Sequence, residues 1–176
     1  DDVFAKEYRI YELSQVEEKM PSSMAYQIPF RHLCNLLQTN SGDIDAVVAS
    51  QKDIKEDQIE RFRTRCKCAW YWITECAPED FKFALREDGS KADLSGDFLN
   101  AIKRIRDEVV VKLESYEVDK DLQQAMYDIS KEIGIDPKAL FTSMYQVLIA
   151  KDQGPRLASF MKIIGKDKLN KLLENY

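Results

Sequence analysis

Residues 56–76 read EDQIERFRTRCKCAWYWITEC and contain the clearest periodicity in the chain. Apolar side chains recur there at alternating spacings of three and four, at Ile59, Phe62, Cys66, Ala69, Ile73 and Cys76. Such spacing puts all of them on one stripe of an α-helix. We therefore expect a long helix with one buried face, which ends at Pro78 because proline cannot continue the hydrogen-bond ladder.

Further helices are predicted on the N-terminal side of this stretch and immediately after it. Residues 29–40 have helical spacing and stop at Ser41-Gly42, after which a second short helix contains Ile44, Val47 and Val48. On the C-terminal side, the loop around Asp88-Gly89-Ser90 precedes a long helix expected over about residues 95–116.

The next segment, residues 119–151, is predicted to be an antiparallel helix pair. Asp119 is the expected N-cap of its first helix, and Gly134 suits the left-handed residue that follows a helix end. Asp136-Pro137 then restarts the chain as an N-cap followed by a proline in the first turn. Short helices follow, and they close the core.

These elements predict an all-α fold, a helical bundle or α-helix cage of about 7–9 helices in two lobes. Residues 1–28, which include Met20-Pro21-Ser22-Ser23, lack either period and are expected to be an extended lead-in from a preceding domain. Residues 29–90 form the first predicted lobe and residues 91–176 the second. The lobe boundary is placed near residue 90.

Composition narrows the class of protein. The chain has 176 residues, of which 44% are hydrophobic and 32% charged, a balance typical of a packed domain. No apolar run approaches the roughly 18 to 20 residues that cross a bilayer, and no signal peptide is visible. We expect a cytoplasmic protein without a membrane partner. Since the chain begins at Asp1 without an initiator Met, it is expected to be a piece of a longer protein.

The four cysteines favour free thiols over disulfides or a metal site. Cys34, Cys66, Cys68 and Cys76 are irregularly spaced. Cys66 and Cys68 fall within the predicted helix, where side chains two positions apart point in nearly opposite directions. No metal site is predicted.

Cations and aromatic rings gather on the helix predicted over residues 56–76. Arg63, Lys67 and Trp70 flank its apolar stripe on one side, and Arg61, Arg65 and Trp72 flank it on the other. Either row suits a single nucleic-acid strand, since cations bind phosphates and flat rings stack on unpaired bases. The alternative is a solvated basic face with tryptophans at the edge of the core.

A second basic segment covers residues 151–171 and has a local charge of +4. It begins with the turn from Lys151 to Arg156, where a broken helix end offers backbone donors beside two cations. Alternatively, Gly154 and Pro155 simply interrupt the helix and form a loop. The net charge of the whole chain is −5, which argues against a surface built entirely for nucleic acid.

Catalytic chemistry finds little support in the sequence, and no catalytic residue is predicted. The single histidine, His32, has no adjacent Cys or Ser that would form a nucleophile, so a hydrolase using His32 is disfavoured. The six glycines are scattered and form no phosphate-binding loop.

Three segments together resemble the C-terminal region of class I lysyl-tRNA synthetases. These are QIPFRHL at residues 27–33, AWYW at 69–72 followed by APE at 77–79, and LIAKDQGPRL at 148–157. They keep the family's order, and the likeness spans roughly residues 8–173. One departure is Ala150, which stands where the family usually has glycine and puts the local turn in question. Glutamyl-tRNA synthetases share part of the final segment, whereas the Pro-Phe-Arg-His-Leu segment favours the lysine family.

The resemblance implies an α-helix cage that recognises the uridine-rich anticodon of the tRNA for lysine, tRNA(Lys). The parent enzyme would join lysine to this tRNA with ATP and Mg²⁺ in an N-terminal catalytic domain whose signatures do not occur here. This piece would have no cofactor of its own and would not be catalytic. Its partners would be the tRNA(Lys) anticodon stem-loop and its own catalytic domain. The candidate tRNA-binding residues are Arg31, His32, Arg61, Arg65, Trp70, Trp72, Lys151 and Arg156. A helical protein-interaction module is the alternative from another class.

Overall fold

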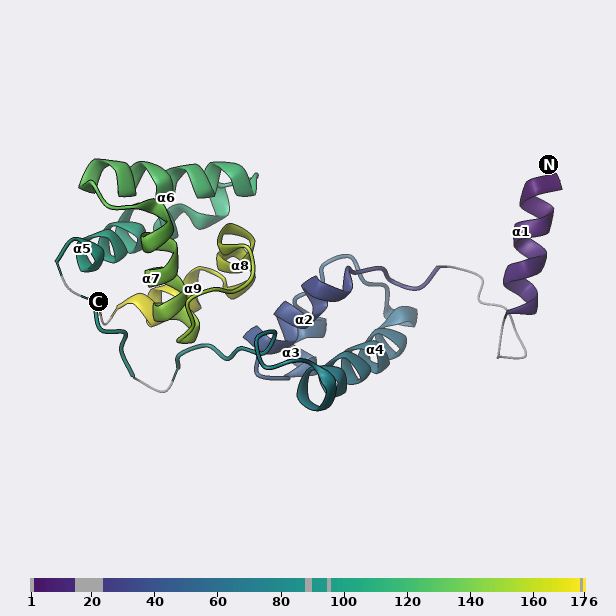
Figure 1. The fold of residues 1–176 in the computed structure, drawn as a ribbon. Coiled ribbons are helices and arrows are strands. Elements are labelled where there is room, and N and C mark those ends of the chain that lie inside the picture. Colours follow the sequence, from purple (N-terminus) through teal and green to yellow (C-terminus); the bar gives the residue numbers. More distant parts are fainter. Residues whose placement is uncertain (1, 15–23, 88–89, 95, 175) are drawn as a thin grey trace.

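The fold is all-α, as predicted from the sequence. The computed structural model describes residues 2–14, 24–87, 90–94, 96–174 and 176, and within these ranges it contains nine α-helices and no strand (Figure 1). The helices are α1 (Asp2–Leu13), α2 (Phe30–Thr39), α3 (Ile44–Ala49), α4 (Ile59–Tyr71), α5 (Gly96–Arg104), α6 (Asp119–Ile133), α7 (Pro137–Ile149), α8 (Leu157–Ile164) and α9 (Lys166–Leu173).

The N-terminal segment corrects one prediction. Residues 2–13 form helix α1, whereas an extended lead-in was expected over residues 1–28. No residue of α1 is buried, so tertiary packing imposes no stripe that a search for periodicity would find. An ion pair between Arg9 and Glu12, one turn apart, supports the helix locally. The Met20–Ser23 stretch lies outside the described residues.

Helices α2, α3 and α4 surround the first hydrophobic cluster, which extends from Ile28 to Ile73. The predicted helix over 56–76 is present, but it begins with a 3₁₀ turn, η1 (Glu56–Gln58), and ends in a π turn, η2 (Trp72–Cys76). Cys76, expected on the buried stripe, is exposed. The wider π turn, in which the N–H of Ala77 donates to the carbonyl of Trp72, shifts the register of the last residues.

The turn between α2 and α3 is closed by a tryptophan. Gly42 has a left-handed φ of 82°, and its N–H donates to the carbonyl oxygen of Leu37 at 2.9 Å. The indole of Trp70 covers this glycine so closely that an added Cβ would lie 2.5 Å from the ring. Trp70 therefore packs as a wall of the first cluster, and Gly42 meets both a conformational and a steric requirement.

Helices α5 to α9 surround the second hydrophobic cluster, which extends from Ala101 to Leu173. The single helix predicted over 95–116 is wrong in its second half. After α5 the chain forms a π turn, η3 (Ile105–Val109), and then a 3₁₀ segment, η4 (Val110–Ser115), interrupted at Lys112. Three consecutive β-branched residues, Val109 to Val111, lower the helix propensity at this point.

The antiparallel pair of α6 and α7 matches the prediction in its turn and differs at its start. Gly134 ends α6 with a left-handed φ of 85°, and the carboxylate of Asp136 accepts from the N–H of Ala139 at 2.9 Å. Val118, and not Asp119, occupies the N-cap of α6. The Asp119 carboxylate instead accepts a hydrogen bond from Ser159 and pairs with Lys162, because α8 packs against α6.

The chain passes from one cluster to the other within three residues. Phe81 packs on the first cluster, whereas Phe83 packs on the second, with its ring 5.1 Å from that of Phe160. Helix α8 also contacts α2, and Ile163 of α8 joins the first cluster. The two clusters are thus in contact, and the domain boundary near residue 90 stays a prediction.

Replacing Gly42 with alanine tests the role of this glycine. We expect Gly42→Ala to lower the free energy of unfolding by about 3 kcal/mol, because left-handed strain of roughly 1–2 kcal/mol adds to displacement of the Trp70 ring. Gly134→Ala is the matched control, since Gly134 has a similar φ but open space around its Cβ position. Urea unfolding should show a loss of only about 1 kcal/mol for the control. Equal losses of unfolding free energy in the two variants would show that contact with Trp70 adds no steric cost at Gly42.

Candidate nucleic-acid interface

Polar bonds hold the segment that crosses between the two clusters. The Lys151 ammonium donates to the carbonyl oxygen of Glu79 at 2.9 Å and also to that of Lys82. Gln38, which is buried, accepts a hydrogen bond from the N–H of Phe83 at 2.7 Å. Each of these bonds ends on a backbone atom of the crossing segment, and they add to the packing of its Phe81 and Phe83 side chains.

A second lysine connects α9 to the end of α2. The Lys168 ammonium donates to the side-chain oxygen of Asn40 at 3.0 Å and to the carbonyl of Thr39 at 3.3 Å. These acceptors are at the C-terminal end of α2, where the partial negative charge of the helix favours a cation. Lys168 was not singled out by sequence reasoning, since its partners are far away along the chain.

The turn after α7 is shaped by its own backbone. Ala150, which follows the helix, adopts a left-handed conformation with φ 55°. The family usually has glycine at this position, yet Ala150 adopts the left-handed conformation of the turn. This conformation costs an L residue about 1–2 kcal/mol in steric strain. Gly154 lies against Ile149 and Tyr145, with a Cβ position 2.9 Å from the former, so a larger residue would displace the turn.

Tyr145 fastens the far end of the same turn. Its hydroxyl donates to the carbonyl oxygen of Pro155 at 2.5 Å. Burial raises the pKa of this phenol, so the hydroxyl stays protonated and remains a donor. Gln146 adds a hydrogen bond to the carboxylate of Asp152 at 2.6 Å. Gly154 is thus required by close packing as well as by its place in a loop.

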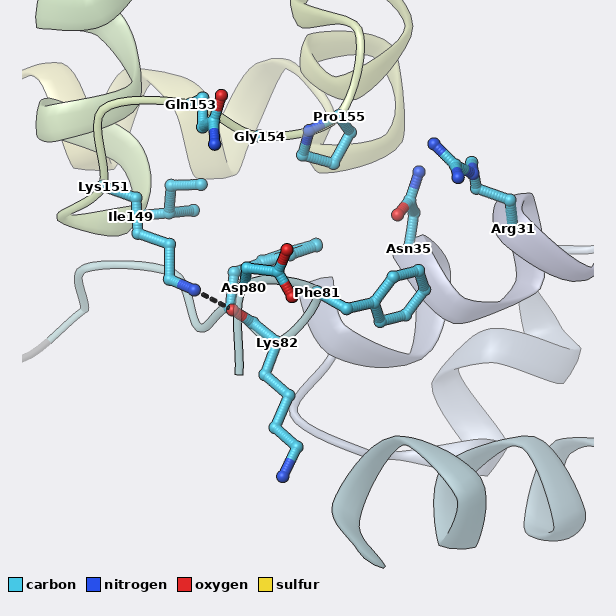
Figure 2. Close-up of a pocket in the computed structure, with 11 residues that line it drawn as sticks. Arg31, Asn35, Asp80, Phe81, Lys82, Ile149, Lys151, Gln153, Gly154 and Pro155 are labelled. Atoms are coloured by element: carbon cyan, nitrogen blue, oxygen red, sulfur yellow. Dashed lines mark hydrogen bonds between the residues drawn. The ribbon is translucent and has the colours of Figure 1, made fainter. Parts of the chain in front are cut away.

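Between this turn, the crossing segment and α2 lies a cavity of about 190 Å³, which we call the junction pocket (Figure 2). Figure 2 shows Lys151 reaching across its base to the backbone of Lys82, while Arg31 and Asn35 extend from α2 on the opposite side of Pro155. Its lining residues are Arg31, Asn35, Asp80, Phe81, Lys82, Phe83, Ile149, Lys151, Gln153, Gly154 and Pro155.

Two of the predicted site residues, Arg31 and Lys151, line the junction pocket. The Lys151 ammonium is engaged by two carbonyls, whereas Arg31 is exposed and has no hydrogen bond or ion pair with any other described residue. Asn35 and Gln153 are likewise unpaired within the described part of the chain. Sequence reasoning missed both amides, although Asn35 stands one helical turn after Arg31 on the same face.

His32 and Arg156 lie near a second opening between α2 and α8. His32 lines this groove together with Asp119, Ser159 and Lys162. Arg156 is the exposed residue that precedes α8, and its charge contributes to lowering the pKa of Asp119. The largest causes of that lowered pKa are the hydrogen bonds from Lys162 and Ser159. Asp119 thus engages Lys162, while the Arg156 guanidinium forms no hydrogen bond or ion pair with any described residue.

Arg61 and Arg65 line a separate groove beside residues 25–27. The Arg65 guanidinium donates to the carbonyl oxygen of Ile28 at 2.6 Å, and more weakly to that of Tyr26 at 3.5 Å. It therefore holds the segment leading into α2. Arg61 is exposed.

Both tryptophans pack against the first cluster. Trp70 covers Gly42, and Trp72 makes edge-to-face contacts with Phe30 and Phe81, with ring centroids 5.2 and 5.1 Å away. This is the arrangement of the alternative interpretation, in which the rings form the edge of the core. Base stacking on Trp70 or Trp72 stays a prediction.

Comparison with known proteins finds lysine–tRNA ligases over nearly the whole chain. The ligase of Treponema pallidum is 51% identical over 174 residues, which cover 98% of this chain and 33% of the ligase. The ligases of Borreliella burgdorferi and Thermococcus kodakarensis are 38% and 32% identical, over 96% and 94% of the chain. The chain spans about a third of the length of these relatives. No family model matches it. The resemblance seen in the sequence is confirmed.

Removal of the Lys151 ammonium should loosen the junction. We expect Lys151→Met, which keeps an unbranched stem, to lower the free energy of unfolding by about 1–3 kcal/mol because two carbonyls lose a charged donor. Lys171→Met is the control, since Lys171 is exposed and forms no bond with a described residue; its unfolding free energy should change by less than about 0.5 kcal/mol. Urea unfolding measures both. A Lys151 variant as stable as the control would mean that this contact does not hold the junction.

Proposed function

Because the chain is homologous to lysine–tRNA ligases over nearly all of its length and to about a third of theirs, we propose that it is the tRNA-recognition region of a class I lysine–tRNA ligase. This homology is the observation that carries the proposal. The whole enzyme would join lysine to tRNA(Lys) in the cytoplasm, with ATP and Mg²⁺ bound by an N-terminal catalytic domain. The described residues form no helix that is long and apolar enough to span a membrane.

In the proposed mechanism, this region binds the anticodon stem-loop and thereby positions the acceptor end in the catalytic domain. The geometry supports recognition because the junction pocket has fixed walls and unpaired polar side chains. Because these walls are already fixed, the protein loses less conformational entropy when it binds a flexible RNA loop. Exposed Arg31 and Arg156 supply cations for phosphate contacts, which position the RNA, whereas base edges would specify it.

The alternative of a protein-interaction module is favoured by α1. Phe4, Tyr8 and Ile10 of this helix are 68%, 48% and 59% exposed. Exposed apolar side chains on one helix are typical of a protein contact. Within the proposed function, that contact would be with the enzyme's own catalytic domain. A protein contact and an RNA contact differ in their response to salt.

Binding of this chain to the tRNA(Lys) anticodon stem-loop tests the proposed function. We expect tighter binding to this stem-loop than to one with a changed anticodon, and an affinity that falls steeply as salt rises because phosphate contacts release counterions. Fluorescence anisotropy at two salt concentrations measures both quantities. Equal binding to the two stem-loops, or none, would contradict anticodon recognition by this chain.

Arg156→Ala should weaken binding to the same stem-loop. The expected loss is about 1–3 kcal/mol if the guanidinium holds a base edge or a well-ordered phosphate. Lys131→Ala, which removes an exposed and unpaired cation from α6, is the matched control for general charge. The two variants should have the same urea midpoint, since neither side chain has a bonded partner among the described residues. An unchanged affinity of Arg156→Ala would exclude this residue from the interface.

A further inference from the structure

We propose that the junction pocket holds one unpaired nucleobase of the bound RNA, with Asn35 and Gln153 contacting its polar edge. This inference rests on the proposed function, and it names two residues and a ligand group for the site. Asn35 extends from α2 and Gln153 from the turn after α7, so two segments far apart in the sequence each contribute one amide (Figure 2).

The walls of the pocket suit a flat ring. Phe81, Phe83, Ile149 and Pro155 supply apolar surface, and the Pro155 ring lies between the two amides (Figure 2). Unpaired bases bind proteins by stacking their faces on apolar or aromatic groups and by hydrogen bonding at their edges. A cavity of about 190 Å³ with this lining provides both kinds of contact for a single base.

The polar side chains favour a base over a phosphate inside the pocket. Asp80 lines it with an exposed carboxylate that forms no bond to another described residue. A phosphate beside this carboxylate would be repelled, whereas a base N–H would donate to it. The Lys151 ammonium already donates to two carbonyls. Arg31 therefore remains as the unpaired cation of the pocket, suited to the phosphate of the nucleotide whose base enters.

Asn35 and Gln153 carry groups that match a base edge. Each amide has an acceptor oxygen and two donor hydrogens. Uracil offers one N–H donor between two carbonyl acceptors, so the two amides together satisfy it, while other bases match other combinations. Neither amide has a partner among the described residues, so binding would not break an existing bond.

The surroundings hold both amides in place before binding. Close packing at Gly154 and the hydrogen bond from Tyr145 to Pro155 fix the turn that carries Gln153. Asn35 belongs to α2, whose neighbouring residues Leu33, Cys34, Leu36 and Leu37 are buried in the first cluster. A preformed pocket of this kind gives specificity that phosphate contacts alone do not give.

A double-mutant cycle between protein and RNA tests the inference. The RNAs are the tRNA(Lys) anticodon stem-loop and a set in which one loop nucleotide at a time is abasic. The proteins are wild type, Asn35→Leu, Gln153→Met and Arg31→Gln. The control is Gln123→Met, which removes an exposed and unpaired amide from α6. Fluorescence anisotropy gives each dissociation constant, and circular dichroism with urea unfolding checks that every variant folds.

We expect Asn35→Leu and Gln153→Met each to weaken binding of the intact stem-loop about tenfold. Against the RNA that lacks the base held in the pocket, each loss should shrink to within twofold, because the contacted group is already gone. Arg31→Gln should instead lower the slope of log affinity against log salt by about 0.7–0.9 and weaken intact and abasic RNAs alike. The Gln123→Met control should match wild type throughout.

The outcomes separate this inference from the proposed function. Losses that are equal for intact RNA and for every abasic RNA, or no loss at all, would overturn the pocket inference. If wild type still prefers the lysine anticodon in that case, the proposed function stands without it. If wild type binds all anticodons equally, anticodon recognition fails, although non-additive losses would still identify the pocket as a base site. Failure of Asn35→Leu to fold leaves Gln153→Met to decide.

Discussion

The buried amide of Gln38 is the constraint on which the arrangement of the two hydrophobic clusters depends. A buried amide is costly unless its polar atoms form hydrogen bonds. The side-chain oxygen of buried Gln38 accepts one from the N–H of Phe83. This bond fixes the backbone between Phe81, which packs on the first cluster, and Phe83, which packs on the second. The Lys151 ammonium then binds the same segment from the turn after α7. The walls of the junction pocket follow from these contacts.

Most helices were predictable because each buries a stripe. The helices α2, α4, α6 and α7 repeat apolar residues at helical spacing, and their predicted ranges match the structure within a few residues. The errors lie where the spacing of apolar residues does not reflect the backbone conformation. Helix α1 buries nothing, so its pattern carried no packing signal. The π turns after α4 and α5 change the helical register, and neither turn contains a glycine or proline that would indicate it in the sequence.

The candidate site was predictable only in part. Arg31 and Lys151 were among the predicted tRNA-binding residues, and the structure brings both to one pocket. Asn35 and Gln153 could not be found in this way, since a polar residue in a helix or turn has no periodic signature. Their proximity depends on the packing of α2 against α8 and on the close turn at Gly154. Such long-range contacts are not encoded in any local window of sequence.

Many cations of this acidic chain are already paired in the structure, which limits the charge available to the proposed RNA contact. Arg63 pairs with Asp45, Arg104 with Glu108 and Glu132, and Lys162 with Asp119. Arg65, Lys151 and Lys168 donate to backbone carbonyls. Much of the basic composition therefore holds the fold together, and a count of lysines and arginines overstates the charge free for RNA. The unpaired cations near the junction, together with the neutral amides, favour a site that depends more on base contacts than on overall charge.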